Sequence, residues 1–389
     1  MPNSGTWDEP TEHTHLRQAV RSVAEPYGYR YFDETARAGR NPTELWHALG
    51  AGGFLGVNIP EEYGGGGKGV SELAVVTEEV AAAGTPLMLL ALSPAVCASI
   101  LVQHGTASQR SSWLPGLATG EHVMAFAITE PDAGSNTYRT RTTATRDGDD
   151  WVLQGTKYYV SHVDNADAIL VVTRTSTDSH TGKAGLTLFL VPVDAPGLER
   201  SAIDVEIRSP ERQYTLHFDQ VRVPAEAVIG DVDGGLRAVF AGLNPERIGT
   251  AAIVNGIARY ALDKGARYAR EREVWDVPIG AHQAVAHPLA RAHIQTELAR
   301  LATRHAARSF DAGGDVRGEH ANIAKFAATE ACAAALDAAI QSHGGNGLAA
   351  EYGLGGLLGL VRLFRIAPVS SEMALNHVAQ HGLGLPRSY

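Results

Sequence analysis

The sequence predicts an α+β protein in which a sheet domain lies between two helical domains. Helix-period segments broken by glycines run to about residue 121, short apolar strand-like runs occupy 122–233, and alanine- and leucine-rich helical patterns fill the rest. We therefore expect a helical domain over residues 1–121, a middle domain of antiparallel strands over 122–233 and a second helical domain over 234–389. A chain of 389 residues is long enough to form more than one core.

The composition argues against several classes of protein. The formal net charge of -10 is spread along the chain without a basic stripe, which argues against nucleic acid or an anionic membrane as the main partner. Cys97 and Cys332 lie in alanine-rich apolar segments, as expected of buried free thiols in a reducing compartment. The N-terminus lacks a signal-peptide pattern, and the apolar run 87–102 is interrupted by Pro94 and too short to span a bilayer. We expect a soluble cytoplasmic protein.

In the N-terminal third, the glycine run 64–67 is followed by Lys68, which invites comparison with a phosphate-binding loop. That loop requires Ser or Thr after the lysine, whereas this chain has Gly69, so we interpret the run as a flexible turn. His13 and His15 have no further ligands at metal-site spacing. We expect no metal site.

The first site signal is the end of an apolar run over residues 123–128. This run suits a buried strand, and the turn-forming residues over 129–136 require the chain to leave the sheet. The hydroxyls of Thr129 and Ser135, with freed backbone N–H groups, can hydrogen-bond the polar edge of a flat ring or a phosphate. Further strands are expected at 151–153, 158–160, 168–172, 186–191 and 218–224.

Beyond Leu236 we expect four or five long helices. Breaks are indicated at 278–280, at 313–314 and at 344–347, and the last of these ends the helix that contains Cys332.

Five motifs, in sequence order, resemble those of the acyl-CoA dehydrogenase family. They are residues 53–65 (GFLGVNIPEEYGG), the loop 129–135 (TEPDAGS), the strand 155–161 (GTKYYVS), the segment with Arg272, Trp275, Pro278, Ile279 and Gln283, and the segment with Gln341 and 344–347 (GGNG). The resemblance implies a helical domain, a middle β-barrel domain and a C-terminal four-helix bundle, with FAD between the last two. It also implies a homotetramer built as a dimer of dimers, an acyl-CoA or acyl-carrier substrate, and electron-transferring flavoprotein as the acceptor.

The resemblance assigns two groups of residues to FAD. The first, in the middle domain, comprises Phe126, Ile128, Thr129, Ser135, Tyr159 and Ser161; the second, in the C-terminal domain, comprises Arg272, Trp275, Gln283, Gln341, Gly344 and Gly345. Donors of the first group would raise the electron affinity of the flavin, and Tyr159, where the family commonly has Trp, can still lie against the ring. In the second group, Arg272 would neutralise the pyrophosphate and Trp275 would stack near the adenine. The family uses this second group across a subunit interface.

The resemblance leaves two carboxylates as candidates for the base that removes the α proton of the acyl thioester. Most family members carry a glutamate in a C-terminal loop, and the ungapped register puts Ser371 at that place and Glu372 one residue further. Residues 243–247 (LNPER) resemble the helix of the isovaleryl- and long-chain branches, in which the glutamate before Arg is the base. We expect Glu246 to be the base, with Glu372 as the alternative. Burial against acyl chain and flavin would raise the pKa of such a base toward neutrality.

Asn244 and Arg247 resemble the groups that hold the nucleotide part of coenzyme A, and Ser135 is a further candidate for substrate binding. The backbone N–H of Ser371 or Glu372 is a candidate for polarising the thioester carbonyl. Two other functions stay open. One is a flavin oxidase or monooxygenase on the same fold, and the other is a flavin-binding homologue without turnover, which the missing C-terminal glutamate favours.

Overall fold

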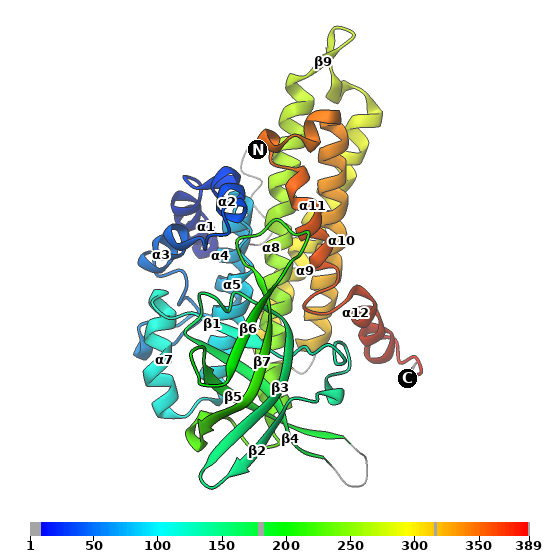
Figure 1. Ribbon diagram of the computed structural model, residues 1–389. Coiled ribbons are helices and arrows are strands. Elements are labelled where there is room, and N and C mark those ends of the chain that lie inside the picture. Colours follow the sequence, from blue (N-terminus) through cyan, green and yellow to red (C-terminus); the bar gives the residue numbers. More distant parts are fainter. Residues whose placement is uncertain (1–8, 178–182, 315–316, 388–389) are drawn as a thin grey trace.

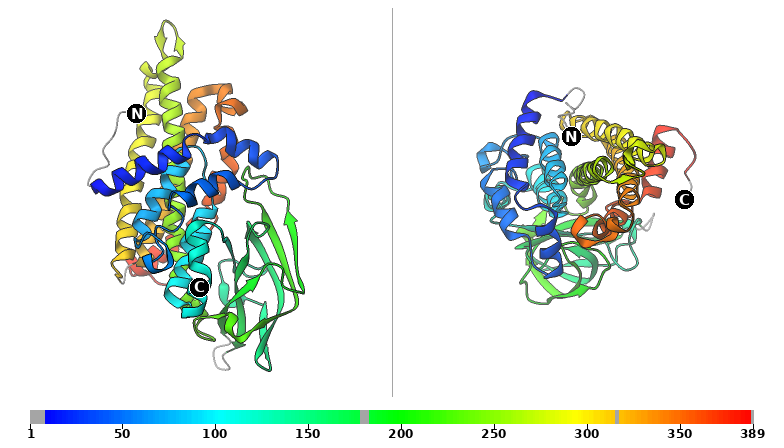
Figure 2. Two further views of the ribbon diagram at one scale, coloured as in Figure 1. Left: turned by 90° about the vertical axis from the view of Figure 1, so that its left-hand side faces the viewer. Right: turned by 90° about the horizontal axis from the view of Figure 1, so that it is seen from above.

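The computed structural model describes residues 9–177, 183–314 and 317–387, and within them it has the helix, sheet, helix order that the sequence predicts (Figure 1). The N-terminal helices lie beside a bundle of long helices. The sheet packs against the same end of both, opposite the end that carries the short strand β9 (Figures 1 and 2).

The N-terminal part is helical, as expected. It contains α1 (Thr11–Ala24), α2 (Gly28–Arg37), α3 (Thr43–Ala51), α4 (Val70–Ala82), α5 (Leu89–Leu92), α6 (Ser99–His104) and α7 (Ala107–Thr119). Thr106 and Gln109 start α7 with a reciprocal cap, in which each side chain accepts from the other residue's backbone N–H at 3.2 and 2.8 Å. A π-helical turn over Ser93–Ala98 joins α5 to α6, and such turns often occur at functional sites.

The glycine run 64–67 is a closed turn that uses its own donors. The backbone N–H groups of Gly65, Gly66, Gly67 and Lys68 donate to the carbonyls of Pro60, Gly56, Ile59 and Val57 at 2.9–3.2 Å. A Cβ added to Gly65 would lie 2.1 Å from the Ile59 carbonyl oxygen, so only glycine fits there. These donors therefore hold the N-terminal domain together and are not directed at a phosphate.

The middle part is one sheet with the strand order β6-β7-β3-β2-β4-β5-β8, and β1 pairs with β4 beside this path. The strands are β1 (Met124–Ala127), β2 (Thr143–Asp147), β3 (Asp150–Ser161), β4 (Ala168–Thr177), β5 (Ala184–Pro192), β6 (Leu198–Ile203), β7 (Gln213–Pro224) and β8 (Val228–Ile229). Neighbours run antiparallel as predicted, except that β1 and β2 run parallel to β4. The sequence does not indicate β2 and β6, because both are largely exposed and lack an apolar run.

The C-terminal part is built on three long helices, α8 (Gly235–Glu271), α9 (Gln283–Asp311) and α10 (Arg317–His343), followed by α11 (Leu358–Phe364) and α12 (Ser371–His377). The strands β9 (Glu273–Val274) and β10 (Val277–Pro278) form a hairpin between α8 and α9. The breaks lie where they are predicted. Fewer long helices form than expected, because the last two segments are only seven residues each.

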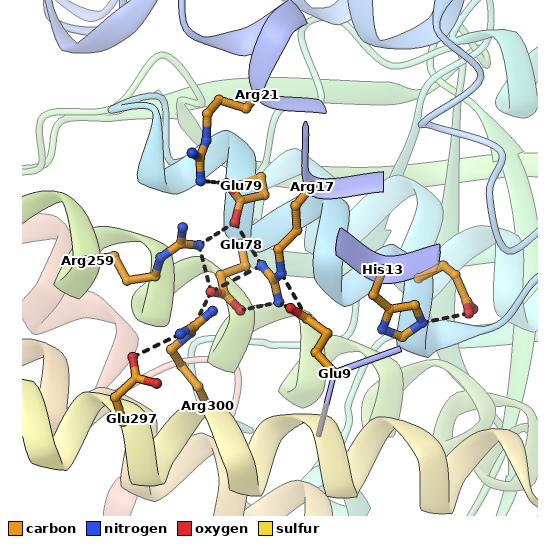
Figure 3. A network of polar contacts seen from close by, with 10 residues as sticks. Glu9, His13, Arg17, Arg21, Glu78, Glu79, Arg259, Glu297 and Arg300 are labelled. Atoms are coloured by element: carbon orange, nitrogen blue, oxygen red, sulfur yellow. Dashed lines mark hydrogen bonds and ion pairs between the residues drawn. The ribbon is translucent and has the colours of Figure 1, made fainter. Parts of the chain in front are cut away.

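A buried network of charged side chains joins the N-terminal helices to the bundle (Figure 3). Glu78 and Glu79 of α4 lie among arginines from three other helices: Arg17 and Arg21 of α1, Arg259 of α8 and Arg300 of α9. Burial alone would raise the pKa of Glu78, but these arginines lower it below its usual range. The network therefore keeps both carboxylates ionised and fastens α1 and α4 to α8 and α9.

No helix in the described ranges is both long enough and apolar enough to cross a membrane. Cys97 and Cys332 are buried free thiols, as predicted.

Candidate active site

The loop that follows β1 is held by a buried ion pair. Lys157 Nζ on β3 lies 2.8 Å from Glu130 Oε1 and donates to the Ile128 carbonyl at 3.0 Å. The Glu130 carboxylate also accepts from the backbone N–H groups of Arg141 and Thr142 at 2.7 and 3.0 Å. Burial lowers the pKa of Lys157 to about 8, although Glu130 opposes this effect. These contacts fix the conformation of residues 128–130.

The same loop has hydrogen-bond donors without an acceptor in the described part of the protein. The carbonyls of Ile128 and Thr129 accept from Lys157 and from the Tyr158 N–H at 2.8 Å. In the described ranges, by contrast, no group accepts from the N–H of Ile128, the N–H of Thr129 or the Thr129 hydroxyl. Both residues are half-buried. Because such donors are costly to leave unpaired, the loop is prepared for a ligand with acceptor atoms along one edge.

The strand β3 adds a flat aromatic face and a hydroxyl beside this loop. Its register with β7 shifts between Lys157 and Val160, and Tyr159 has φ +56°. The Tyr159 ring is 53% exposed. The Ser161 hydroxyl donates to the Gln213 side-chain oxygen at 3.0 Å. Of the other residues in the first group, Phe126 is buried in β1 and Ser135 is exposed on the loop.

Glu246 lies on α8 where this helix packs closely against the π-helical turn and α5. A Cβ added to Gly242 would lie 2.8 Å from the Val96 side chain, and one added to Gly249 would lie 3.5 Å from Ala91. These glycines flank Glu246 one turn away on either side, so α8 lies close to both segments on each side of this residue. Only 8% of Glu246 is exposed.

The Glu246 carboxylate has no hydrogen-bond partner among the described residues. Burial raises its pKa to about 7, although the Arg247 guanidinium acts in the opposite direction. A carboxylate with a pKa near neutrality and no competing partner is able to take a proton from a ligand.

Arg247 and Asn244 form a polar pair within two residues of Glu246 on α8. The Arg247 guanidinium donates to the Asn244 side-chain oxygen at 2.8 Å, but its buried Nε has no acceptor within the described part of the chain. Burial lowers the pKa of Arg247. A Cβ added to Gly318 of α10 would lie 3.9 Å from the His377 ring and 4.0 Å from the Asn244 oxygen. The segment 244–247 therefore lies near both α10 and α12, and among the described residues the buried guanidinium forms no ion pair within 4 Å, although the neighbouring Glu246 acts on it electrostatically.

The C-terminal loop offers a less suitable base. Glu372 is exposed, and its own backbone N–H together with Ser370 lowers the pKa of its carboxyl group. The N–H of Ser371 donates to the Arg365 carbonyl at 3.0 Å, which leaves it unavailable to a substrate carbonyl.

The second group of candidate FAD-binding residues, from the C-terminal domain, lies at the end of the molecule opposite the sheet. Trp275 is 81% exposed at the tip of the β9–β10 hairpin, which Figure 1 shows at the end opposite the sheet. The other members, Arg272, Gln283, Gln341, Gly344 and Gly345, are also exposed. The end of α8 lies 25 residues after Glu246, which corresponds to about 38 Å at 1.5 Å per residue. Within one chain, the structure therefore does not bring the two groups together.

Comparison with known proteins identifies the fold. Three family models match in order: the N-terminal domain of acyl-CoA dehydrogenase over residues 10–121, the middle domain over 125–221 and the C-terminal domain over 233–383. The chain belongs to the acyl-CoA dehydrogenase family. Among curated acyl-CoA dehydrogenases, FadE12 of Mycobacterium tuberculosis H37Rv is 52% identical over 382 residues, which cover 98% of each chain.

Solved acyl-CoA dehydrogenase structures confirm the predicted fold class. Butyryl-CoA dehydrogenase from Megasphaera elsdenii superimposes with a TM-score of 0.90 at 27% identity, over 97% of this chain and 99% of that one. A glutaryl-CoA dehydrogenase from Mycobacterium smegmatis in complex with FADH2 also has a TM-score of 0.90 at 27% identity, over 98% and 96%.

The residues present fit FAD, the cofactor of the acyl-CoA dehydrogenase family. The unused donors of Ile128 and Thr129 suit the acceptor edge of a flavin, and Tyr159 offers a face to its ring. A Cβ on Gly344 or Gly345 would meet nothing within 4 Å, so that backbone is open to a phosphate. Among the described residues, no group of three or more His, Cys, Asp or Glu is placed to hold a metal ion.

Three structural contributors escape sequence reasoning: the Glu130–Lys157 pair, Gln213 behind Ser161, and Lys325, a fully buried lysine of α10. Glu130 and Lys157 do lie inside two of the motifs that resemble the family, and this position is the only sequence feature that indicates them.

Proposed function

We propose that this FAD-dependent acyl-CoA dehydrogenase uses Glu246 as the base that removes the α proton of an acyl-CoA thioester. The observation that carries the proposal is the Glu246 carboxylate itself, which is buried, has no hydrogen-bond partner among the described residues and has a pKa of about 7. Near neutral pH a large share of such a base is ionised, and its proton affinity is high enough for it to keep the proton it takes. Bound FAD supplies the acceptor for the hydride from Cβ.

The surroundings of Glu246 support this role. Only 8% of Glu246 is exposed, and low exposure to solvent strengthens electrostatic interactions at the reacting atoms. The donors of Ile128 and Thr129 orient the cofactor and stabilise negative charge at its edge. Glu372 remains a weaker alternative, because its exposed carboxyl group has a lowered pKa.

We propose that Arg247 and Asn244 bind the coenzyme A part of the substrate. The buried Nε of Arg247 has no acceptor among the residues that the structure describes, and a phosphate or carbonyl oxygen would satisfy it. The position of the base on α8 supports a closer relation to the isovaleryl- and long-chain branches. The exposed Ser135 remains a candidate for both cofactor and substrate.

We further propose that the second group of residues completes the FAD site of a neighbouring subunit in a homotetramer. Its support is the distance of about 38 Å along α8 between Glu246 and the hairpin, which a cofactor bound beside the base cannot bridge within one chain. We propose electron-transferring flavoprotein as the acceptor and a cytoplasmic location, which the two free thiols favour. The domain limits 1–121, 122–233 and 234–389 are supported by the end of α7 at Thr119, the start of β1 at Met124 and the start of α8 at Gly235.

Anaerobic mixing of the FAD-loaded protein with straight-chain and branched acyl-CoAs tests the activity. We expect rapid bleaching of the flavin absorbance by at least one acyl-CoA, and the pattern across the panel will show the preferred acyl group. Bleaching by none of them would contradict the proposal and favour a binding homologue without turnover. Oxygen consumption with substrate and no added acceptor would favour a flavin oxidase.

A further inference from the structure

Lys325 of α10 is a fully buried cation that contacts the C-terminal loop, residues 365–370 between α11 and α12. Its Nζ donates to the carbonyl of Val369 at 2.5 Å, and the residue is 0% exposed. Burying an ammonium group costs free energy unless the charge is paired or hydrogen-bonded. Lys325 therefore needs an explanation beyond the packing of α10.

Backbone hydrogen bonds from Ile366 and Ala367 to the Leu363 carbonyl, at 2.8 and 2.9 Å, hold the first part of the loop to α11, and further contacts lie at its two ends. The Arg365 carbonyl accepts from the Ser371 N–H at 3.0 Å, and the Arg365 guanidinium binds both oxygens of Glu330 at 2.7 and 3.0 Å. The Ser370 hydroxyl accepts from the Met373 N–H at 3.2 Å and so starts α12. Between these ends, the Lys325 hydrogen bond reaches the middle of the loop from the bundle.

The last residue of α12, His377, lies close to the proposed substrate-binding end of α8. His377 of α12 and Asn244 of α8 approach the same point on α10, at Gly318. Four charged groups influence the Lys325 ammonium electrostatically. They are Glu372 of α12, Arg247 of α8, Glu330 of α10 and Arg365 of the loop. Lys325 thus lies where these elements meet.

We propose that Lys325 is a positioning residue, which holds residues 369–371 and the start of α12 against the substrate-binding end of α8. This inference rests on the proposed function, because it takes Glu246 and Arg247 as residues that meet the substrate. Lys325 does not take part in proton transfer. Its contribution is to hold this segment in place beside Arg247 and Glu246, so its loss weakens substrate binding more than it slows flavin reduction.

The test compares the holoenzyme with its Lys325→Met and Lys325→Gln variants. The methionine removes the donor at similar length, whereas the glutamine keeps a neutral donor. We expect Lys325→Met to raise KM for the best acyl-CoA by roughly ten- to a hundredfold, as for a lost hydrogen bond from a charged group, with the limiting rate of flavin reduction changed by less than about threefold. The KM of Lys325→Gln should lie between those of the wild type and Lys325→Met.

Lys264 of α8 provides a matched control, because it is a half-buried lysine that lies over the Tyr260 ring at 5.1 Å. Lys264→Met should leave KM unchanged. Hydrogen exchange without substrate gives a second readout: in Lys325→Met the amides of residues 369–376 should exchange faster, while the remainder of α10 stays protected.

Unchanged KM and unchanged exchange in the Lys325 variants would overturn the inference, and so would an equal rise of KM in Lys264→Met. If Lys325→Met does not fold, Lys325→Gln decides by the same two measurements. If the wild-type flavin is not reduced by any acyl-CoA, the proposed function fails, and the exchange comparison still decides whether Lys325 holds the loop.

Discussion

The Lys157 ammonium and the Glu130 carboxylate form an ion pair at 2.8 Å with both side chains almost completely buried. This pair connects β3 to the loop after β1 and so aligns the unused donors of Ile128 and Thr129. A charge left alone in such a site is far more costly than the intact pair is favourable.

Lys157→Met should therefore destabilise the protein by about 3–5 kcal/mol, because it leaves the Glu130 carboxylate buried without its cation. The loop would shift, and the FAD content of the purified protein should fall. Absorbance and thermal unfolding measure the two effects. The exposed pair between Arg141 and Asp132, at 2.8 Å, offers the control: Arg141→Gln should change neither the FAD content nor the stability. A Lys157→Met protein with full FAD content and unchanged stability would refute the role of this ion pair in holding the loop.

Glu246→Gln should keep FAD and ligand binding while lowering the rate of flavin reduction by roughly two to four powers of ten, the range for a lost general base. The amide keeps size and hydrogen bonding but not basicity. Stopped-flow reduction under anaerobic conditions measures this rate. Glu372→Gln should lower the rate of flavin reduction far less. A large loss in Glu372→Gln together with a normal rate in Glu246→Gln would place the base in the C-terminal loop.

The pH dependence of kcat/KM should report the same carboxyl group. The buried Glu246 has a pKa of about 7, so the base is protonated below this pH and ionised above it. The rate should therefore rise as pH increases through about 7 and then level off. In Glu246→Gln this rise should be absent. A rise centred near the ordinary pKa of a carboxyl group, about 4.3, would instead indicate an exposed base such as Glu372.

The charged network of Figure 3 should make the fold sensitive to acid. The arginines lower the pKa of Glu78 and Glu79 in the folded state, so their stabilising effect is present above the unfolded pKa and is lost as pH falls below it. Glu78→Gln should destabilise the protein by about 3–5 kcal/mol at neutral pH, because buried arginines lose their counter-charge. Denaturant unfolding measures this loss. Glu34→Gln, which breaks an exposed pair with Arg30, should have almost no effect.

The exposed hairpin group should matter only in the assembled protein. We expect light scattering to give a tetramer, and Arg272→Ala to weaken FAD binding without unfolding the chain, because Arg272 is exposed and holds no part of the core. Flavin retention on dilution, compared between wild type and variant, checks this. A monomer with full flavin occupancy would rule out the shared site.

The sequence predicts the three-part fold well, because helical and strand periodicity are local signals. Strand β6 escapes prediction because an exposed edge strand leaves no apolar alternation. For the site, motif resemblance indicates Glu246, but its burial depends on Gly242 and Gly249 meeting residues some 150 positions earlier. The partners Lys325 and Val369 are 44 residues apart, and such pairs follow from tertiary packing, which has no signature in a single sequence.

Helix α8 carries the proposed base near its start and the exposed hairpin just beyond its end. If each cofactor site consists of the Thr129 loop of one subunit and the hairpin of its neighbour, two inactive variants with different defects can form an intact site together. A chain damaged near Thr129 still lends an intact hairpin, and a chain that lacks Arg272 still offers an intact loop. Co-expression of two such inactive chains would yield hybrid particles in which half of the sites are whole. Genetic complementation between alleles, and not only biochemistry, would then reveal which residues serve their own subunit and which serve its neighbour.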